Sequence, residues 1–314
     1  IIINGLWSYH SYATWNAVDA LRKSSTSKLP RLLVMPHGML DPYFQRARNR
    51  RLKAVRNRIY WKLLEQKVVN EADGLLFTCE TELVLARETF TPYYPRYEYN
   101  IGYGIPPPPV FHFRMSAAFS SHCPGLDEED YLLFISRIDP KKGIDLLISA
   151  YILLHKEFIA AKKKMPKLVI AGPGIDTRFG KELKQQLENA PDVKPHVIFT
   201  GMLDGDAKWG AFYGCQAFVL PSHQENFGIA VAEALACGKP VLISEEVNIW
   251  REIMTEGGGI VEKDNLTGVL NMLREWLNMS KKKHAEMGDR ARTTYRKHFT
   301  VSGVTQKLND VIRS

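Results

Sequence analysis

The 314-residue chain has few cysteines, and their positions argue against two kinds of site. The four cysteines are Cys79, Cys123, Cys215 and Cys237, which form no close pairs and have no metal-ligand spacing. This usage fits a reducing compartment better than a disulfide framework. The histidines are scattered without metal-ligand spacing, so we expect neither a metal site nor a cofactor.

Long hydrophobic runs are also missing. Apolar stretches such as "YLLFIS" (131–136) and "KLVIAG" (167–172) have the length of strands, well short of a membrane span. With 45% hydrophobic and 24% charged residues, the composition is that of a globular protein large enough for two domains. The chain opens on "IIINGLW", inside an apparent strand and without an initiator Met or leader, so we expect the N-terminal segment to be missing.

Acidic residues are absent from one stretch in particular. The formal net charge is +8, and residues 46–62, "RARNRRLKAVRNRIYWK", contain only basic charges. A solvated helix face would give this pattern, and so would attraction to an anionic membrane or acceptor. No recognition motif or aromatic stacking pattern accompanies the run, so we expect no nucleic-acid partner.

Short apolar runs alternate with longer stretches of helical periodicity. In the first half, strands are predicted at 29–36, 74–79 and 97–105. In the second half, they are predicted at 131–136, 167–172, 196–201, 217–221 and 240–244. Because the runs are continuously apolar and alternate with helices, the pattern predicts parallel α/β architecture.

Four consecutive prolines, at 106–109, interrupt this alternation. They continue neither a sheet nor a helix interior, so we expect a domain boundary, although a long surface loop within one domain would look the same. The predicted organisation is an incomplete first domain, a linker, a second domain and a terminal helix, at residues 1–113, 114–130, 131–296 and 297–314.

The segment "SHQENFGIAVAEALACGKP" (222–240) places two carboxylates around a predicted helix start. Ligands of parallel sheets bind beyond the carboxyl ends of strands, and a helix N-terminus there attracts phosphate. Gly228 would allow close approach of a ligand. Glu225 and Glu233 would then hold two polyol groups of one ligand; alternatively, they are a capping acid and a solvent-facing helical residue.

The segment "SRIDPKKG" (136–143) follows a predicted strand and lies at the same sheet edge. Arg137 and Lys142 are therefore candidates to neutralise a diphosphate leaving group without a metal ion. In isolation, two cations in a loop are usually surface charge. Opposite the helix that follows Gly228, they favour a phosphate clamp.

The chain resembles the retaining glycosyltransferases of family 4, which have the GT-B fold. The donor half of that family is matched by "FISRIDPKKGIDLLISAY", "GMLDGDAKWGAFYGCQAFVLPSHQENFGIAVAEALACGKPVLIS" and "VNIWREI". The acceptor half is matched by "NGLWSYHSYATWNAV" and "PHGMLDPYF", particularly as in bacterial polysaccharide enzymes. The Glu-x7-Glu motif is highly specific in this context, and "SRxxxxKG" is moderately so.

This resemblance implies two Rossmann-like domains facing a cleft, with the first apparently truncated and the terminal helix packed back on it. Arg137 and Lys142 would bind and stabilise the departing diphosphate, Glu225 would hold the donor sugar, and Glu233 would bind the ribose. His37 would line the catalytic cleft from the acceptor side, although a loop or capping role is the plain alternative. The implied catalytic residues are thus Glu225, His37, Arg137 and Lys142.

Further donor contacts are implied around this set. Backbone contacts to the sugar and phosphates would come from Asn226, Phe227, Gly228 and Ile229, and the base would lie near Gly201 and Met202. The chain departs from the family pattern in Asn4 of "NGLW", in Tyr103-Gly104, and in lacking the first strand and Gly-rich loop. That missing segment bears on whether this chain is active.

The expected activity is metal-independent, retaining transfer of a sugar from a UDP- or GDP-sugar to a hydroxyl acceptor, in cell-surface polysaccharide or glycolipid synthesis. No residue is an obvious nucleophile, so the resemblance favours front-side displacement. The expected location is the cytoplasm, with peripheral contact at the inner face of the membrane. Two alternatives stay open, a sugar-nucleotide epimerase of the same fold and a non-catalytic nucleotide-sugar-binding fragment.

Overall fold

The computed structural model describes residues 1–24, 30–46, 51–126 and 129–314. The chain forms two compact units. Unit 1 comprises Ile1–Gly104 and Val301–Ser314, and unit 2 comprises Ile105–Thr300.

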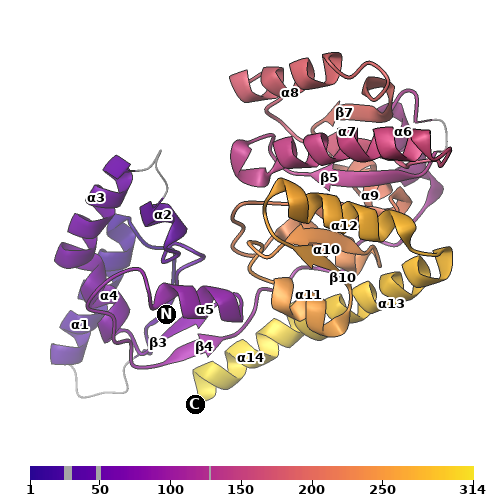
Figure 1. The fold of residues 1–314 in the computed structure, drawn as a ribbon. Coiled ribbons are helices and arrows are strands. Elements are labelled where there is room, and N and C mark those ends of the chain that lie inside the picture. The colour runs from indigo at the N-terminus through magenta and orange to yellow at the C-terminus, as the bar shows by residue number, and fades with distance from the viewer. Residues whose placement is uncertain (25–29, 47–50, 127–128) are drawn as a thin grey trace. The chain divides into compact units, whose positions relative to one another are not determined.

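Unit 1 is built on a parallel sheet whose described strands follow the order β1-β2-β3-β4 (Figure 1). The strands are β1 (Ile2–Asn4), β2 (Leu33–Met35), β3 (Gly74–Phe77) and β4 (Glu98–Asn100). The helices between them are α1 (Tyr9–Ser24), α2 (Tyr43–Arg46), α3 (Arg51–Tyr60), the π-helical turn η2 (Trp61–Glu65), α4 (Gln66–Glu71) and α5 (Glu80–Ala86). Parallel neighbours need such crossover connections, which explains the alternation read from the sequence.

The two faces of the sheet in unit 1 are covered by different helices. Val34 packs in a cluster with residues of α1, η2 and α4, whereas Leu33 and Leu76 pack in a second cluster with Val311. Successive strand residues point to opposite faces, so this division follows from the period of two. Val311 belongs to the terminal helix α14 (Val301–Arg313), which therefore contributes to the core of unit 1 although it ends the chain.

Unit 2 contains a larger parallel sheet, whose described strands follow the order β10-β9-β8-β5-β6-β7. These strands are β5 (Tyr131–Ile135), β6 (Lys167–Ala171), β7 (Val197–Gly201), β8 (Ala217–Leu220), β9 (Val241–Ser244) and β10 (Gly259–Glu262). Strands β5, β6, β8 and β9 are almost completely buried, as expected for a sheet with helices on both faces. The order reverses direction at β5 and β8, and ligand sites of such sheets lie beside that point.

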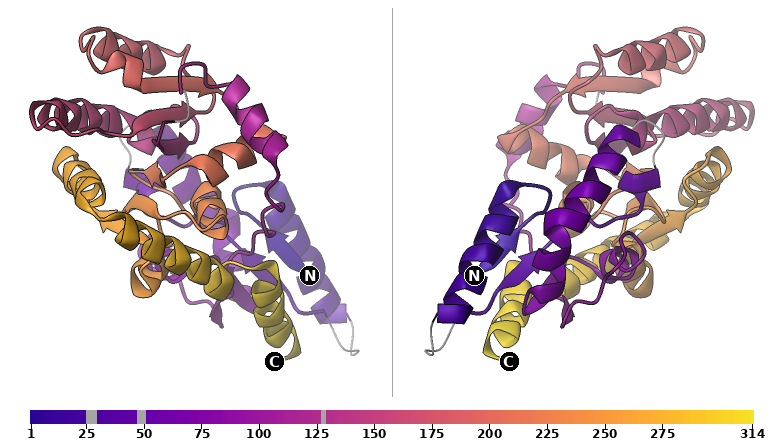
Figure 2. Two further views of the ribbon diagram at one scale, coloured as in Figure 1. Left: turned by 90° about the vertical axis from the view of Figure 1, so that its right-hand side faces the viewer. Right: turned by 90° about the vertical axis from the view of Figure 1, so that its left-hand side faces the viewer.

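The main helices of unit 2 are α6 (Phe113–Ser121), α7 (Ile144–Ala160), α8 (Arg178–Glu188), α9 (Gly205–Gly214), α10 (Ile229–Ala236), α11 (Trp250–Glu256), α12 (Leu266–Asn278) and α13 (Lys281–His298). Helix α7 packs against α12, and α6 packs against α9, so each pair forms one layer (Figure 2). The sheet lies between these two layers.

The predicted linker, residues 114–130, contains a helix in its described part. Helix α6 begins at Phe113 and clusters with unit 2. It packs closely on α9, since a Cβ on Gly210 would lie 2.0 Å from the carbonyl oxygen of Met115. The buried side chains Met115 and Phe119 are four residues apart, a helical spacing that the neighbouring irregular sequence obscured.

Candidate functional site

The sequence-predicted donor residues of unit 2 gather at the carboxyl ends of its central strands. A cavity of about 410 Å³ opens there. It is lined by Ile135, Ser136, Arg137, Gly172, Pro173, Met202, Leu203, Lys208, Leu220, Glu225, Gly228, Ile229, Ala230 and Glu233. These residues come from the ends of β5, β6, β7 and β8 and from the start of α9 and α10, so tertiary packing assembles the site from distant sequence segments.

The loop after β5 holds Lys142 in place through a short 3₁₀ turn. Asp139 caps this turn by accepting a hydrogen bond from the Lys141 backbone N–H at 2.9 Å. Gly143 ends it with φ of 64°, and a Cβ there would lie 1.9 Å from the carbonyl oxygen of Pro221. The loops after β5 and β8 therefore touch backbone to backbone, and only glycine permits it.

That contact brings together two of the predicted catalytic side chains. Lys142 is only 8% exposed, and its ammonium donates to the Glu225 carboxylate. The Glu225 backbone is fixed in turn by the loop after β9. Its N–H donates to the backbone carbonyl of Glu246 at 2.8 Å, and its carbonyl accepts from the backbone N–H of Asn248 at 2.9 Å. A largely buried lysine requires an anionic partner, and Glu225 supplies it.

Glu233 has a partner that the sequence did not predict. Its carboxylate accepts a hydrogen bond from the Lys208 ammonium at 2.6 Å. Lys208 lies on α9, lines the same cavity, and stands 4.8 Å over the Trp209 ring. The sequence offered one indication of this role, since a lysine follows the "GMLDG" loop at the same sheet edge. The pairing of Lys208 with Glu233 depends on how α9 and α10 pack.

Arg137 lines the cavity beside the loop after β6. A Cβ on Gly172 would lie 1.9 Å from the carbonyl oxygen of Ser136, and Ile138 donates its N–H to the carbonyl of Pro173 at 2.8 Å. The loops after β5 and β6 are thus also in backbone contact. The guanidinium of Arg137 and the two lysine–glutamate pairs concentrate charge around one cavity.

The remaining predicted donor residues occupy different positions. Gly228 caps α10 with φ of 77°, and Ile229 and Met202 are exposed at the cavity. Phe227 is buried and packs edge-to-face on Phe299, so its side chain is structural. Four predicted residues do not line the cavity, although each neighbours a lining residue in sequence or in space. They are Lys142, Gly201, Asn226 and Phe227.

His37 lies in unit 1, in the loop that follows β2. Its Nε2 is 3.0 Å from Asn4 Oδ1, and its ring meets Tyr103 edge-on at 6.3 Å. The backbone at His37 has φ of 52°, an unusual value that the buried Glu82 supports by accepting a hydrogen bond from the Gly38 N–H. The loops after β1, β2 and β4 thus form a polar edge of unit 1.

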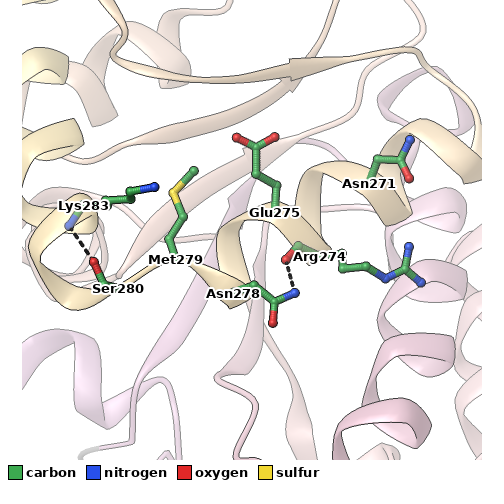
Figure 3. A pocket seen from close by; sticks show the side chains of 7 residues that line it. All are labelled: Asn271, Arg274, Glu275, Asn278, Met279, Ser280 and Lys283. Carbon is green, nitrogen blue, oxygen red and sulfur yellow. Dashed lines mark hydrogen bonds between the residues drawn. The ribbon is translucent and has the colours of Figure 1, made fainter.

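A larger cavity, of about 610 Å³, lies elsewhere in unit 2, at the corner between α12 and α13 (Figure 3). Three of its polar lining residues have partners of their own. Ser280 caps α13 by accepting from the Lys283 N–H, Asn278 donates to the Arg274 carbonyl, and Arg274 pairs with Glu157 at 3.1 Å. These contacts do not converge on the cavity, so we assign it no ligand.

Within the described residues, no group of three or more His, Cys, Asp and Glu side chains is placed to hold a metal ion. Across the same residues, no helix combines the length and the low polarity needed to span a bilayer.

The fold matches solved glycosyltransferases of the GT-B class. Sucrose-phosphate synthase from Thermosynechococcus elongatus aligns with a TM-score of 0.71 and 19% identity, covering 100% of this chain and 72% of that one. HepE from Anabaena, solved with UDP-glucose, aligns with a TM-score of 0.72 and 16% identity, covering 99% and 78%. The protein therefore has the GT-B fold of two parallel-sheet α/β domains, as the sequence predicted.

The sequence assigns the family. Residues 124–294, more than half of the chain, match the model of the glycosyl transferases group 1, and the chain belongs to this family. An uncharacterized glycosyltransferase of Methanocaldococcus jannaschii, MJ1607, is 33% identical over 155 residues, which are 48% of this chain and 37% of that protein. A D-inositol 3-phosphate glycosyltransferase of Gordonia bronchialis is 28% identical over 249 residues, 73% of this chain and 49% of that protein. The chain spans less than half the length of these curated relatives.

Proposed function

We propose that the protein is a retaining, metal-independent glycosyltransferase of family 4, in which the Glu-x7-Glu motif binds a nucleoside-diphosphate sugar. The observation that carries this proposal is the pair of lysine–glutamate contacts at one cavity, Lys142 with Glu225 and Lys208 with Glu233. HepE, which shares the fold, has been solved with UDP and with UDP-glucose, which favours a donor of that kind.

The donor would extend between the two pairs. Its diphosphate would lie at the N-terminus of α10, where backbone N–H groups and Arg137 attract negative charge. The Lys142 ammonium has three donors, so it can hold Glu225 and a phosphate oxygen together. Glu225 would accept hydroxyls of the sugar, and Glu233, oriented by Lys208, would accept the ribose hydroxyls.

In the reaction, the bond between the anomeric carbon and the diphosphate oxygen breaks while the acceptor oxygen bonds on the same face of the sugar. The acceptor proton passes to an oxygen of the departing diphosphate. Arg137 and Lys142 stabilise the negative charge that develops there, which is the role a metal ion would otherwise have. His37 would contact the acceptor from unit 1.

The proposal extends to the biological setting. A serotype-specific mannosyltransferase of Escherichia coli, WbdA, is 29% identical over 131 residues, 40% of this chain. We propose a role in cell-surface polysaccharide or glycolipid synthesis on the cytoplasmic side of a membrane. The acceptor would be a hydroxyl of a sugar or lipid-linked carrier. Residues 46–62, of which 47–50 lie outside the described residues, would contact the anionic membrane surface.

The test is a panel of UDP- and GDP-sugars with sugar acceptors, assayed for transfer by the wild type and Glu225→Ala. We expect the substitution to reduce transfer by at least about 10³-fold, because Glu225 holds the reacting end of the donor. Glu245→Ala removes an exposed carboxylate from the next loop and serves as the matched control. Thermal melts of both variants establish that the fold is intact.

Three outcomes contradict the proposal in different ways. Full transfer by Glu225→Ala removes the site assignment. Epimerisation of the donor without an acceptor makes the protein an epimerase of the same fold. Donor binding without any turnover makes it a nucleotide-sugar-binding module.

A further inference from the structure

Helix α3 of unit 1 presents its apolar side chains to solvent. Leu52, Val55 and Ile59 are 89%, 55% and 55% exposed, and Leu63 in the following π-helical turn is 66% exposed. Residues three and four apart share one helix face, so these side chains form a stripe, here called the α3 stripe. The helix lies at the outside of unit 1 (Figures 1 and 2).

The opposite face of the same segment is buried. Ala54, Asn57 and Trp61 are the buried positions, and Trp61 stacks on Phe90 at 4.8 Å. These residues anchor the helix in the core of unit 1. The α3 stripe is therefore additional apolar surface, which packing within the unit does not require.

Cations flank the α3 stripe on both sides. The basic residues between positions 51 and 62 are Arg51, Lys53, Arg56, Arg58 and Lys62, and this stretch contains no acid. Within the described residues, none of the five forms an ion pair with a carboxylate. A cavity of about 270 Å³ adjoins the stripe, where Arg58 and Lys62 stand beside the Trp61 and Phe90 rings.

An apolar stripe between two rows of unpaired cations matches an anionic phospholipid surface. The acyl region accepts the apolar side chains, while phosphates bind the flanking cations. A purely acidic protein or a nucleic acid would use the cations and leave the apolar stripe in water. We propose that α3 inserts the α3 stripe into the interfacial layer of an anionic membrane and so anchors the protein peripherally. This anchoring goes beyond the charge attraction read from the sequence and does not depend on the transfer chemistry.

The experiment measures co-sedimentation of the full chain with vesicles. Vesicles of phosphatidylcholine alone are compared with vesicles containing about 30% phosphatidylglycerol. We expect binding to the anionic vesicles at least about tenfold tighter than to the neutral ones, with part of it persisting at high salt because apolar insertion is not screened.

Two sets of variants distinguish the contribution of the α3 stripe to vesicle binding from that of the cations. Leu52→Ser with Ile59→Ser is expected to weaken vesicle binding at least about tenfold. Its control is Leu153→Ser with Ile159→Ser, two exposed residues of α7 in unit 2, which should leave binding unchanged. Replacing Arg51, Lys53 and Arg58 by Gln should also weaken binding, whereas the same change at the exposed Lys281, Lys282 and Lys283 of α13 should not.

Insertion depth is read directly with a label. All four native cysteines are buried, so Leu63→Cys accepts an environment-sensitive dye selectively. A blue shift on anionic vesicles, absent for Leu153→Cys, supports insertion. The proposal is overturned by equal binding to neutral vesicles, by equal losses in the control variants, or by salt-abolished binding without a blue shift. Transfer to a soluble acceptor should be unaffected in every stripe variant, so failure of membrane binding leaves the transferase proposal standing.

Discussion

The two units share a parallel α/β design but use their charges in opposite ways. In unit 2, cations at the sheet edge are paired with carboxylates around a cavity, as in Lys142 with Glu225 and Lys208 with Glu233. In unit 1, the sheet edge presents the polar side chains of His37 and Asn4, while the cations of α3 form no ion pair with any described carboxylate. Paired, partly buried charge is fixed in position and suits recognition of one ligand, whereas exposed charge suits a broad surface.

The first way to test this comparison is to remove the two paired lysines of unit 2 separately. Lys142→Met should lower kcat about 10²-fold or more, because it removes a cation from the developing negative charge. Lys208→Met should raise the KM for the donor about tenfold with little change in kcat, because it disturbs only ribose binding. Steady-state kinetics with the donor identified by the panel measures both.

The two variants control one another, since each removes a lysine from a carboxylate at the same cavity. Similar losses of kcat in both would show that the pairs act as one structural unit and would remove the division of roles. Urea unfolding of each variant checks that the glutamate left without its lysine partner has not destabilised the fold.

A second test addresses Glu65, a fully buried carboxylate of the π-helical turn in unit 1. Burial raises its pKa above the usual 4.5, although hydrogen bonds from Ser11 and the Trp7 N–H oppose the shift. Above 4.5 the unfolded chain therefore releases this proton before the folded chain does, and stability falls as pH rises toward the folded pKa. Glu65→Gln removes this slope, as measured by hydrogen exchange in peptides of unit 1 across the acid range.

The outcome for Glu65→Gln is judged on the slope and not on absolute stability, since the new amide changes the local hydrogen bonds. An unchanged pH slope in unit 1 would mean that Glu65 is ionised in the fold without penalty.

The smallest expected effect concerns His155, which is buried in unit 2 beside His196, with ring centroids 4.5 Å apart. Burial lowers its pKa below the usual 6.5, and the neighbouring His196 adds to the shift. Below 6.5 the unfolded chain therefore binds the proton first, and stability falls as pH falls toward the folded pKa. His155→Leu should flatten this loss in hydrogen exchange of unit 2 peptides while leaving unit 1 unchanged.

Together, the Glu65 and His155 tests predict opposite pH slopes for the two units. Just above pH 4.5, falling pH should strengthen unit 1 through Glu65, and just below pH 6.5 it should weaken unit 2 through His155. Slopes of the same sign in both units would contradict the comparison.

The sequence predicted most of the strands and the α/β class because buried parallel strands are continuous apolar runs, as in "YLLFI" and "KLVIA". It did not predict β10. It also predicted Glu225 and Arg137 at one sheet edge, because loops after neighbouring parallel strands meet there. Lys208 was missed because its partner Glu233 is 25 positions away and their meeting depends on helix packing. Helix α6 was missed because the prolines before it dominate the local pattern, and the π-helical turn has no distinct periodicity.

The glycines of the site have one further consequence. Gly143 touches Pro221, and Gly172 touches Ser136, so the loops after β5, β6 and β8 are held main chain to main chain. A change of side chain elsewhere in these loops leaves that framework in place. New ligand preferences can therefore evolve, or be engineered, by exchanging side chains around a fixed scaffold, whereas replacing either glycine would disturb the contact between two of the loops.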